Sequence, residues 1–209
     1  MLIRRHDAAL DDQEWRSFLG AHDFGELIAA GRDRPVPVVV PAHFVFDGEH
    51  TIHLHLAKEN PVWEAIAERA VAMMSTFDAY TYIPTGWNAP VATPPEAGVP
   101  TSYYAAVQAI CDVSVVDDPD AVAGILRKQL GHFQPEGGHA PVTGSPPYGP
   151  LLSAIRGIEM RIVDVRAKFK FGGNRTSEHR QRIAERLAER AGPLDLEARD
   201  HLLRRLERG

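Results

Sequence analysis

The stretch FVFDGEHTIHLHL, residues 44–56, places an Asp-Gly pair between two short apolar runs. Asp47-Gly48 is typical of a tight β-hairpin turn, because both residue types tolerate positive φ. Residues 51–56 then alternate between apolar and polar side chains, as a half-buried strand does. The stretch therefore predicts two antiparallel strands, at residues 44–46 and 51–56.

Similar apolar runs, bounded by turn residues, occur on both sides of this hairpin. We expect further strands at residues 24–30, 36–40, 70–76, 79–83, 105–116 and 158–171. Residues 105–116 alternate strictly, which predicts that Cys111 is a small core residue. In residues 158–171 the alternation shifts phase after Val163.

Helical patterns are inserted between these strands rather than alternating with them. Helices are expected at residues 11–21, 61–69, 117–130 and 176–191, with a last one ending near residue 207. Residues 84–100 and 134–150 are rich in Pro and Gly and are expected to be loops. This order predicts a mainly β fold with α additions (α+β), an antiparallel barrel of six strands rather than a doubly wound parallel sheet.

Composition is that of an ordinary globular chain, and its charge is uneven. The net charge is −5, yet residues 156–209 carry 14 basic and 9 acidic side chains. The basic end could contact DNA or an acidic partner, or it could form solvated helices with Arg–Glu pairs. One cysteine, no membrane-length apolar run and no signal-like N-terminus predict a cytoplasmic protein with no membrane partner.

Four segments together resemble the PaiB-like family of FMN-binding transcriptional regulators. AHFVF at residues 42–46 resembles the family's T-H-L-P-F, and HLAKENP at 55–61 resembles H-M-A-R-A-N-P. VPTSYY at 99–104 resembles V-P-T-W-N-Y, and AKFKFGGNR at 167–175 resembles K-F-K-L-S-Q-N-R. Ser102 and Tyr103 stand where the family usually has Trp and Asn. Gly172 and Gly173 stand where Ser and Gln are usual. These departures concern the contacts with the isoalloxazine ring more than the fold.

The resemblance implies an FMN-binding split β-barrel that forms a homodimer and negatively regulates transcription. It implies an FMN-binding domain over residues 1–175, followed by a C-terminal helical extension over residues 176–209. The chain has no G-x-G-x-x-G or Walker A loop, so cations and hydroxyls must hold the FMN phosphate.

Lys58 is the best candidate for this role because it lies between a strand and the helix that Pro61 begins. Asn60 can cap that helix, whose N-terminus adds partial positive charge. The alternatives are a surface lysine and an asparagine that caps the helix and does nothing else.

Histidines gather on the predicted hairpin, where His53 and His55 share one face. The family motifs assign polar contacts with flavin or phosphate to His43 and His55. A His-x-His pair can also supply two metal ligands, but the spacing offers no third, so no metal is expected. Exposed or hydrogen-bonded strand histidines are the alternative.

Aromatic side chains supply further candidates. Tyr80 and Tyr82, with Trp87, can stack on a flavin ring or fill a dimer interface. Thr101 and Tyr104 are expected in the loop before the strand at residues 105–116. The resemblance implies that this loop reaches a cofactor held mainly by the neighbouring subunit.

A second cationic cluster comprises Lys168, Lys170, Asn174 and Arg175. The two lysines share a strand face, and Gly172-Gly173 would let the backbone approach another group closely. An edge strand that its lysines protect from pairing is the alternative.

An FMN-binding homodimer with a regulatory role in transcription is the leading hypothesis. The sequence has no helix-turn-helix signature, so DNA contact would fall to the basic C-terminal region. An NAD(P)H-linked flavin oxidoreductase is the enzymatic alternative, although no residue demands a catalytic acid or base role. A split barrel that binds haem or another small molecule through its histidines is the third.

Overall fold

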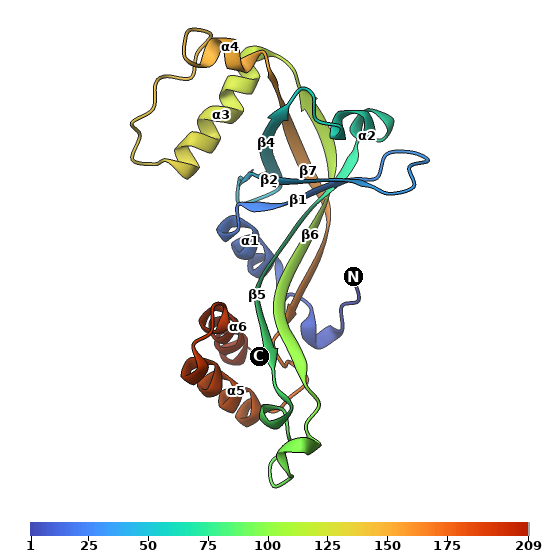
Figure 1. The fold of residues 1–209 in the computed structure, drawn as a ribbon, viewed down its shortest axis with the longest axis vertical. Helices are drawn as coiled ribbons and strands as arrows, with labels where there is room; N and C mark the ends of the chain where they lie inside the picture. Colours follow the sequence, from blue (N-terminus) through green and yellow to red (C-terminus); the bar gives the residue numbers. More distant parts are fainter. Residues whose placement is uncertain (209) are drawn as a thin grey trace. The chain divides into compact units, whose positions relative to one another are not determined.

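The computed structural model describes residues 1–208, which form two compact units (Figure 1). The first unit comprises residues 1–12, 77–107 and 166–208, and the second comprises residues 13–76 and 108–165. Residues of the three longest strands belong to both units. None of the helices in residues 1–208 combines the length and the hydropathy needed to cross a membrane.

A seven-stranded sheet in the order β2-β1-β5-β6-β7-β4-β3 forms the framework. Its strands are β1 (Phe24–Ala29), β2 (Val38–His43), β3 (Val45–Phe46), β4 (Thr51–Ala57), β5 (Val71–Ile83), β6 (Thr101–Val116) and β7 (Ile155–Lys170). The pairs β1–β2, β1–β5, β3–β4 and β4–β7 are antiparallel. The antiparallel α+β prediction is confirmed, but the expected number of six strands is wrong, because the eight predicted runs form seven strands, with the runs at residues 70–76 and 79–83 joined in β5.

The hairpin at residues 44–56 forms as β3 and β4, with Val45 opposite His53. The Asp47 carboxylate accepts hydrogen bonds from the backbone N–H groups of three following residues, at 2.8–2.9 Å. Gly48 has a φ of 89°, a region that glycine enters without steric cost. The local turn chemistry therefore accounts for this hairpin.

Strand boundaries differ from the sequence expectation most at β5 and β6, while β2 and β7 differ by one to three residues at their ends. The runs at residues 70–76 and 79–83 form one strand, β5, in which Ala79 has a φ of 53°. Burial changes phase at Phe77 and Asp78, as at a β-bulge, so Thr76 and Ala79 are both buried. β6 begins at Thr101, so the placement of Thr101 and Tyr104 in a loop is wrong.

Helices lie between and after the strands. They are α1 (Asp12–Ala21), α2 (Val62–Glu68), α3 (Pro119–Phe133), α4 (Tyr148–Leu152), α5 (Ser177–Arg190) and α6 (Asp195–Glu207), with short 3₁₀ turns at Arg5–Asp7, Thr85–Trp87 and Pro95–Ala97. Helix α4 occupies the end of a region expected to be loop. Thr176 caps α5 by accepting a hydrogen bond from His179 N.

Each unit buries its own apolar side chains. In the second unit Leu27, Leu54, Met74 and Met160 are fully buried, and Cys111 is buried as predicted. In the first unit the paired helices α5 and α6 contribute Leu187 and Leu202, and β7 contributes Phe169. A further apolar cluster in the second unit includes Val122 of α3 and Leu152 of α4.

Candidate functional site

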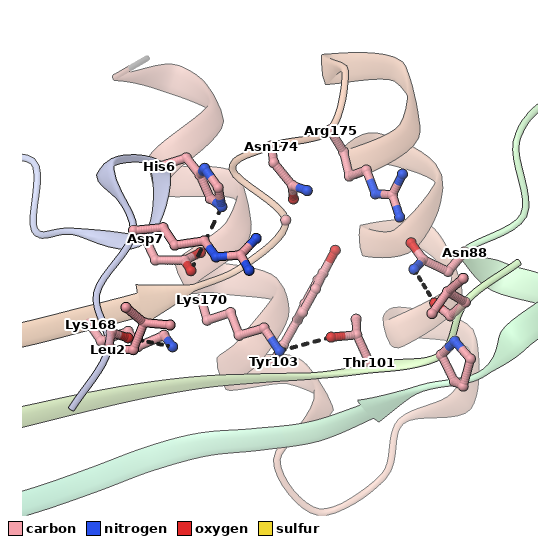
Figure 2. A pocket seen from close by; sticks show the side chains of 14 residues that line it. Leu2, His6, Asp7, Asn88, Thr101, Tyr103, Lys168, Lys170, Asn174 and Arg175 are labelled. Atoms are coloured by element: carbon pink, nitrogen blue, oxygen red, sulfur yellow. Dashed lines mark hydrogen bonds and ion pairs between the residues drawn. The ribbon is translucent and has the colours of Figure 1, made fainter.

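A pocket of about 350 Å³ lies in the first unit, among the N-terminal segment, the start of β6, the end of β7 and the turn that leads into α5 (Figure 2). Its charged lining residues are mostly cationic. They are Arg4, Lys168, Lys170 and Arg175, with Asp7 as the one carboxylate and His6 beside it. Such a lining favours an anionic ligand.

The two lysines of β7 point the same way because side chains alternate along a strand, and Phe169 between them is fully buried. Lys170 Nζ donates to Thr101 Oγ1 at 2.8 Å, and Lys168 Nζ donates to the carbonyl oxygen of Leu2 at 3.0 Å. Each ammonium group has three donors, so both keep donors for a ligand. The contacts hold the cations at the pocket without using up their hydrogen-bonding capacity.

Both lysines lie over the ring of Tyr104. Lys168 Nζ lies 5.4 Å and Lys170 Nζ 5.9 Å from the centre of the Tyr104 ring. At these distances a cation is attracted to the negative face of an aromatic ring. Tyr104 therefore orients the lysines and is not itself among the residues that line the pocket.

The turn after β7 completes the pocket. Gly172 has a φ of 69°, and Gly173 lies so close to His6 that a Cβ there would meet the His6 carbonyl oxygen. Asn174 and Arg175 follow, and both are exposed. The two glycines thus allow the turn to fold tightly against the N-terminal segment and present Asn174 and Arg175 at the pocket (Figure 2).

Tyr103 forms the buried wall of the pocket. Its side chain is 2% exposed, and its hydroxyl has no hydrogen-bond partner within residues 1–208. Burial raises the pKa of the Tyr103 phenol to about 12, although Arg180 and Arg175 act in the opposite direction. The group therefore stays protonated at neutral pH and is available as a hydrogen-bond donor.

A polar network anchors the loop at residues 84–100 to α5 beside the pocket. Asn88 donates from Nδ2 to the Val99 carbonyl oxygen, and its Oδ1 lies 3.0 Å from His179 Nε2. Arg182 Nη2 lies 3.3 Å from the other ring nitrogen of His179. Burial, with Arg175 and Arg182 nearby, lowers the pKa of His179. A neutral imidazole that donates from Nε2 to Asn88 and accepts from Arg182 satisfies all three groups.

Five of the residues predicted from sequence meet in this pocket: Thr101, Lys168, Lys170, Asn174 and Arg175. Tyr80 and Tyr82 lie on β5, about half exposed, and do not line it. Trp87 is covered by the guanidinium group of Arg190, 4.6 Å from its ring centre.

The remaining candidates belong to the second unit. His43 and His55 lie together, with ring centres 5.6 Å apart, and His55 Nδ1 is 2.6 Å from Gln129 Oε1. Asn60 Oδ1 accepts from the N–H of Val62, the first residue of α2, at 3.0 Å, while Pro61 occupies the N-cap position. The Lys58 side chain is exposed and does not line the pocket. No group of three metal-ligating side chains occurs within residues 1–208.

Sequence reasoning missed several residues of the pocket. Arg4 and Asp7 come from an N-terminal segment that carries no motif, and Asn88 lies in the proline-rich loop. The sequence marks Tyr103 only as a departure from a family pattern. A signal for Tyr103 was present, because it continues the alternation of buried residues through Ala105 and Val107.

Comparison with known proteins identifies the family. The protein-family model described as "Putative FMN-binding domain" matches residues 1–164. The chain belongs to this FMN-binding domain family. The curated protein "Protease synthase and sporulation protein PAI 2" of Bacillus subtilis (strain 168) is 22% identical over 198 residues, which cover 92% of each chain. The resemblance to the PaiB-like family is thereby confirmed.

Solved structures of flavin proteins share the fold of this FMN-binding domain family member. The flavocytochrome Anf3 from Azotobacter vinelandii has a TM-score of 0.61 and 16% identity, covering 85% of this chain and 77% of its own. The FAD and heme binding protein from Mycobacterium smegmatis has a TM-score of 0.60 and 15% identity, covering 84% and 78%. The split-barrel prediction is confirmed as a fold. The cations at the end of β7 lie beyond the family match.

Proposed function

We propose that this protein binds FMN, with the phosphate group in the cationic pocket of the first unit. The observation that carries the proposal is the convergence of Lys170, Lys168 and Arg175 with the Thr101 hydroxyl in one pocket of a chain from an FMN-binding family. Cations and hydroxyls are the groups that hold a phosphate where no glycine-rich loop is present.

The residues present fit the phosphate end of FMN. Four permanent cations face one carboxylate, and the buried Tyr103 hydroxyl offers a further donor. The volume of about 350 Å³ lies at the low end for ligand pockets, so the pocket suits part of the cofactor. When bound, FMN supplies hydride and electron transfer chemistry, while the protein supplies position and electrostatics.

A homodimer would complete the site by supplying a surface for the isoalloxazine ring. On β5 of the first unit, Phe77 is 70% exposed, Tyr80 54% and Tyr82 50%. Large exposed aromatic side chains favour protein or ligand contact. We propose that this strand face contributes to the dimer interface and that the flavin ring lies at the interface.

Titration of the purified protein with FMN and riboflavin tests FMN binding. Quenching of flavin fluorescence and a shifted absorption band are expected with FMN, at least 10-fold tighter than with riboflavin, because riboflavin lacks the phosphate. Equal affinities would contradict the phosphate site.

Sedimentation at several protein concentrations tests the dimer, and a monomer that binds FMN fully would contradict it.

We also propose a regulatory role in transcription, supported by the similarity to the PaiB-like family. The basic C-terminal region is less available to DNA than its composition indicates. Arg180 donates to the Leu202 carbonyl oxygen, Arg205 to that of Ala8, and Arg190 to the Asp195 carboxylate. These three arginines therefore use hydrogen-bond donors on two backbone carbonyl oxygens and one carboxylate of the first unit.

Gel-shift assays on the full chain test direct DNA contact, because truncation would remove buried side chains of α5 and α6. The exposed residues Arg186 and Arg204 are the ones to replace by Gln. Retardation that weakens in this double variant and with rising salt would support the contact. Unchanged retardation would exclude these two arginines as DNA contacts.

Bleaching of bound FMN by NADH or NADPH would instead favour the oxidoreductase alternative.

A further inference from the structure

The hydroxyl of Tyr103 is a buried polar group that the fold leaves unsatisfied. Only 2% of the residue is exposed, and no group within residues 1–208 hydrogen-bonds to the oxygen. Burying a hydroxyl without a partner costs free energy, and most buried polar groups in native proteins are paired. An exception of this kind at a pocket points to a ligand that supplies the partner.

The hydroxyl is also aimed at a place where an anion would sit. In Figure 2 the Tyr103 ring stands upright in the pocket, with its oxygen directed toward Asn174 and Arg175. Lys170 and Thr101 lie near the base of the same ring in this view. A donor hydroxyl among cations, with no acceptor assigned to it, matches the needs of a phosphate oxygen.

Gly172 explains how the tyrosine can occupy this position. A Cβ at residue 172 would lie 2.3 Å from the Tyr103 oxygen and 3.2 Å from the ring carbon that carries it. Side-chain carbons do not approach an oxygen this closely, so a residue with a Cβ here would displace the phenol. The glycine and the tyrosine are therefore spatially linked, and both stand where the PaiB-like pattern has other residues.

We propose that the Tyr103 hydroxyl donates a hydrogen bond to the phosphate of the bound ligand, and that Gly172 provides the space it needs. The inference rests on the proposed function for the identity of the ligand, FMN. It goes further by assigning a phosphate-binding role to a residue pair that departs from the family pattern.

The test compares Tyr103→Phe with the wild-type chain, using FMN, riboflavin and inorganic phosphate as probes. Tyr103→Phe should weaken FMN binding about 10- to 100-fold, the range for a hydrogen bond to a charged group, and leave riboflavin binding within twofold. The melting temperature of the unliganded variant should equal or exceed that of the wild type by up to about 4 °C, because an unsatisfied hydroxyl has been removed. Tyr148→Phe in α4 is the control for loss of a phenol outside the pocket.

Two results would overturn the inference while leaving FMN binding intact. One is unchanged FMN affinity in Tyr103→Phe. The other is a clear fall in melting temperature, which would assign the hydroxyl a structural partner. Failure of the wild-type chain to bind FMN would instead defeat the proposed function. In that case the melting temperatures of both proteins with inorganic phosphate test the inference. A rise in the melting temperature of the wild type but not of Tyr103→Phe supports the inference. The same change in both proteins, or no change in either, overturns it.

Discussion

Thr81 on β5 and Asp195 at the start of α6 are joined by a 2.5 Å hydrogen bond from the threonine Oγ1 to the carboxylate Oδ1. Arg190 donates to both carboxylate oxygens at 2.7 Å, and the backbone N–H of Gly192 donates to Oδ2 at 2.8 Å. Asp195 is 3% exposed. One buried carboxylate therefore ties the C-terminal helices to the strand that carries the exposed tyrosines.

Asp195→Asn should destabilise the fold by roughly 2 kcal/mol at pH 7, as the linkage between pKa and stability gives for a carboxylate of this kind. Hydrogen bonds from Arg190, then from Thr81 and Gly192, lower the pKa of Asp195 from 3.8 to about 2. Because the folded-state pKa is lowered, this stabilisation is present above pH 4 and is lost as the pH falls toward 2. Urea denaturation at pH 7 and pH 2.5 measures it. Asp200→Asn, an exposed position on the same helix, should change stability by under about 0.5 kcal/mol. A deficit in Asp195→Asn that persists undiminished at pH 2.5 would refute the assignment.

His53 should make the protein less stable in mild acid. It is buried on β4, its Nε2 lies 3.0 Å from Lys128 Nζ, and burial followed by Lys128 lowers its pKa below 6.5. Glu159 and Asp47 oppose this shift without reversing it. The unfolded chain binds the proton more readily, so stability should fall as the pH drops from 7.5 to 5. Lys128→Met should reduce that fall, as measured by thermal melts across this range.

The exposed His139→Gln is the matched control for the pH series and should leave the slope unchanged. His43 and His179 also have lowered pKa values, so part of the fall should persist in Lys128→Met. A steeper loss of stability in acid for Lys128→Met than for the wild type would contradict this account.

Gly172→Ala should cost more stability in the wild-type chain than in Tyr103→Phe. The left-handed φ of 69° penalises any Cβ by about 1 kcal/mol in both backgrounds. The collision with the Tyr103 oxygen arises only where that oxygen is present. A double-mutant cycle from urea denaturation should therefore give a coupling energy of about 1 kcal/mol or more. Additive effects would mean that the two residues do not constrain each other.

Much of the fold could be predicted because its signals are local. The Asp47-Gly48 turn, the Thr176 cap and the alternation around Cys111 each depend on a few neighbouring residues. The boundaries that failed depend on tertiary context. A continuous β5 requires Ala79 to adopt a positive φ, which local propensity gives no reason to expect.

The site was harder to predict because its parts are far apart in sequence. The clustering of Lys168, Lys170 and Arg175 follows from strand alternation and the turn after β7, so the sequence indicated it. The contribution of Arg4 depends on an N-terminal segment that packs beside β7, where Ala8 pairs with Lys168. No short-range pattern encodes such a contact.

Titration of FMN against Lys170→Met and Lys58→Met tests the central claim most directly, because Lys170 lines the proposed phosphate pocket and Lys58 is the phosphate-binding candidate that the sequence predicted. If the pocket of the first unit holds the phosphate, Lys170→Met should weaken FMN binding about 10-fold or more and leave riboflavin binding unchanged, while Lys58→Met should change FMN binding less than threefold. A large loss of FMN affinity in Lys58→Met, with wild-type affinity in Lys170→Met, would contradict the account.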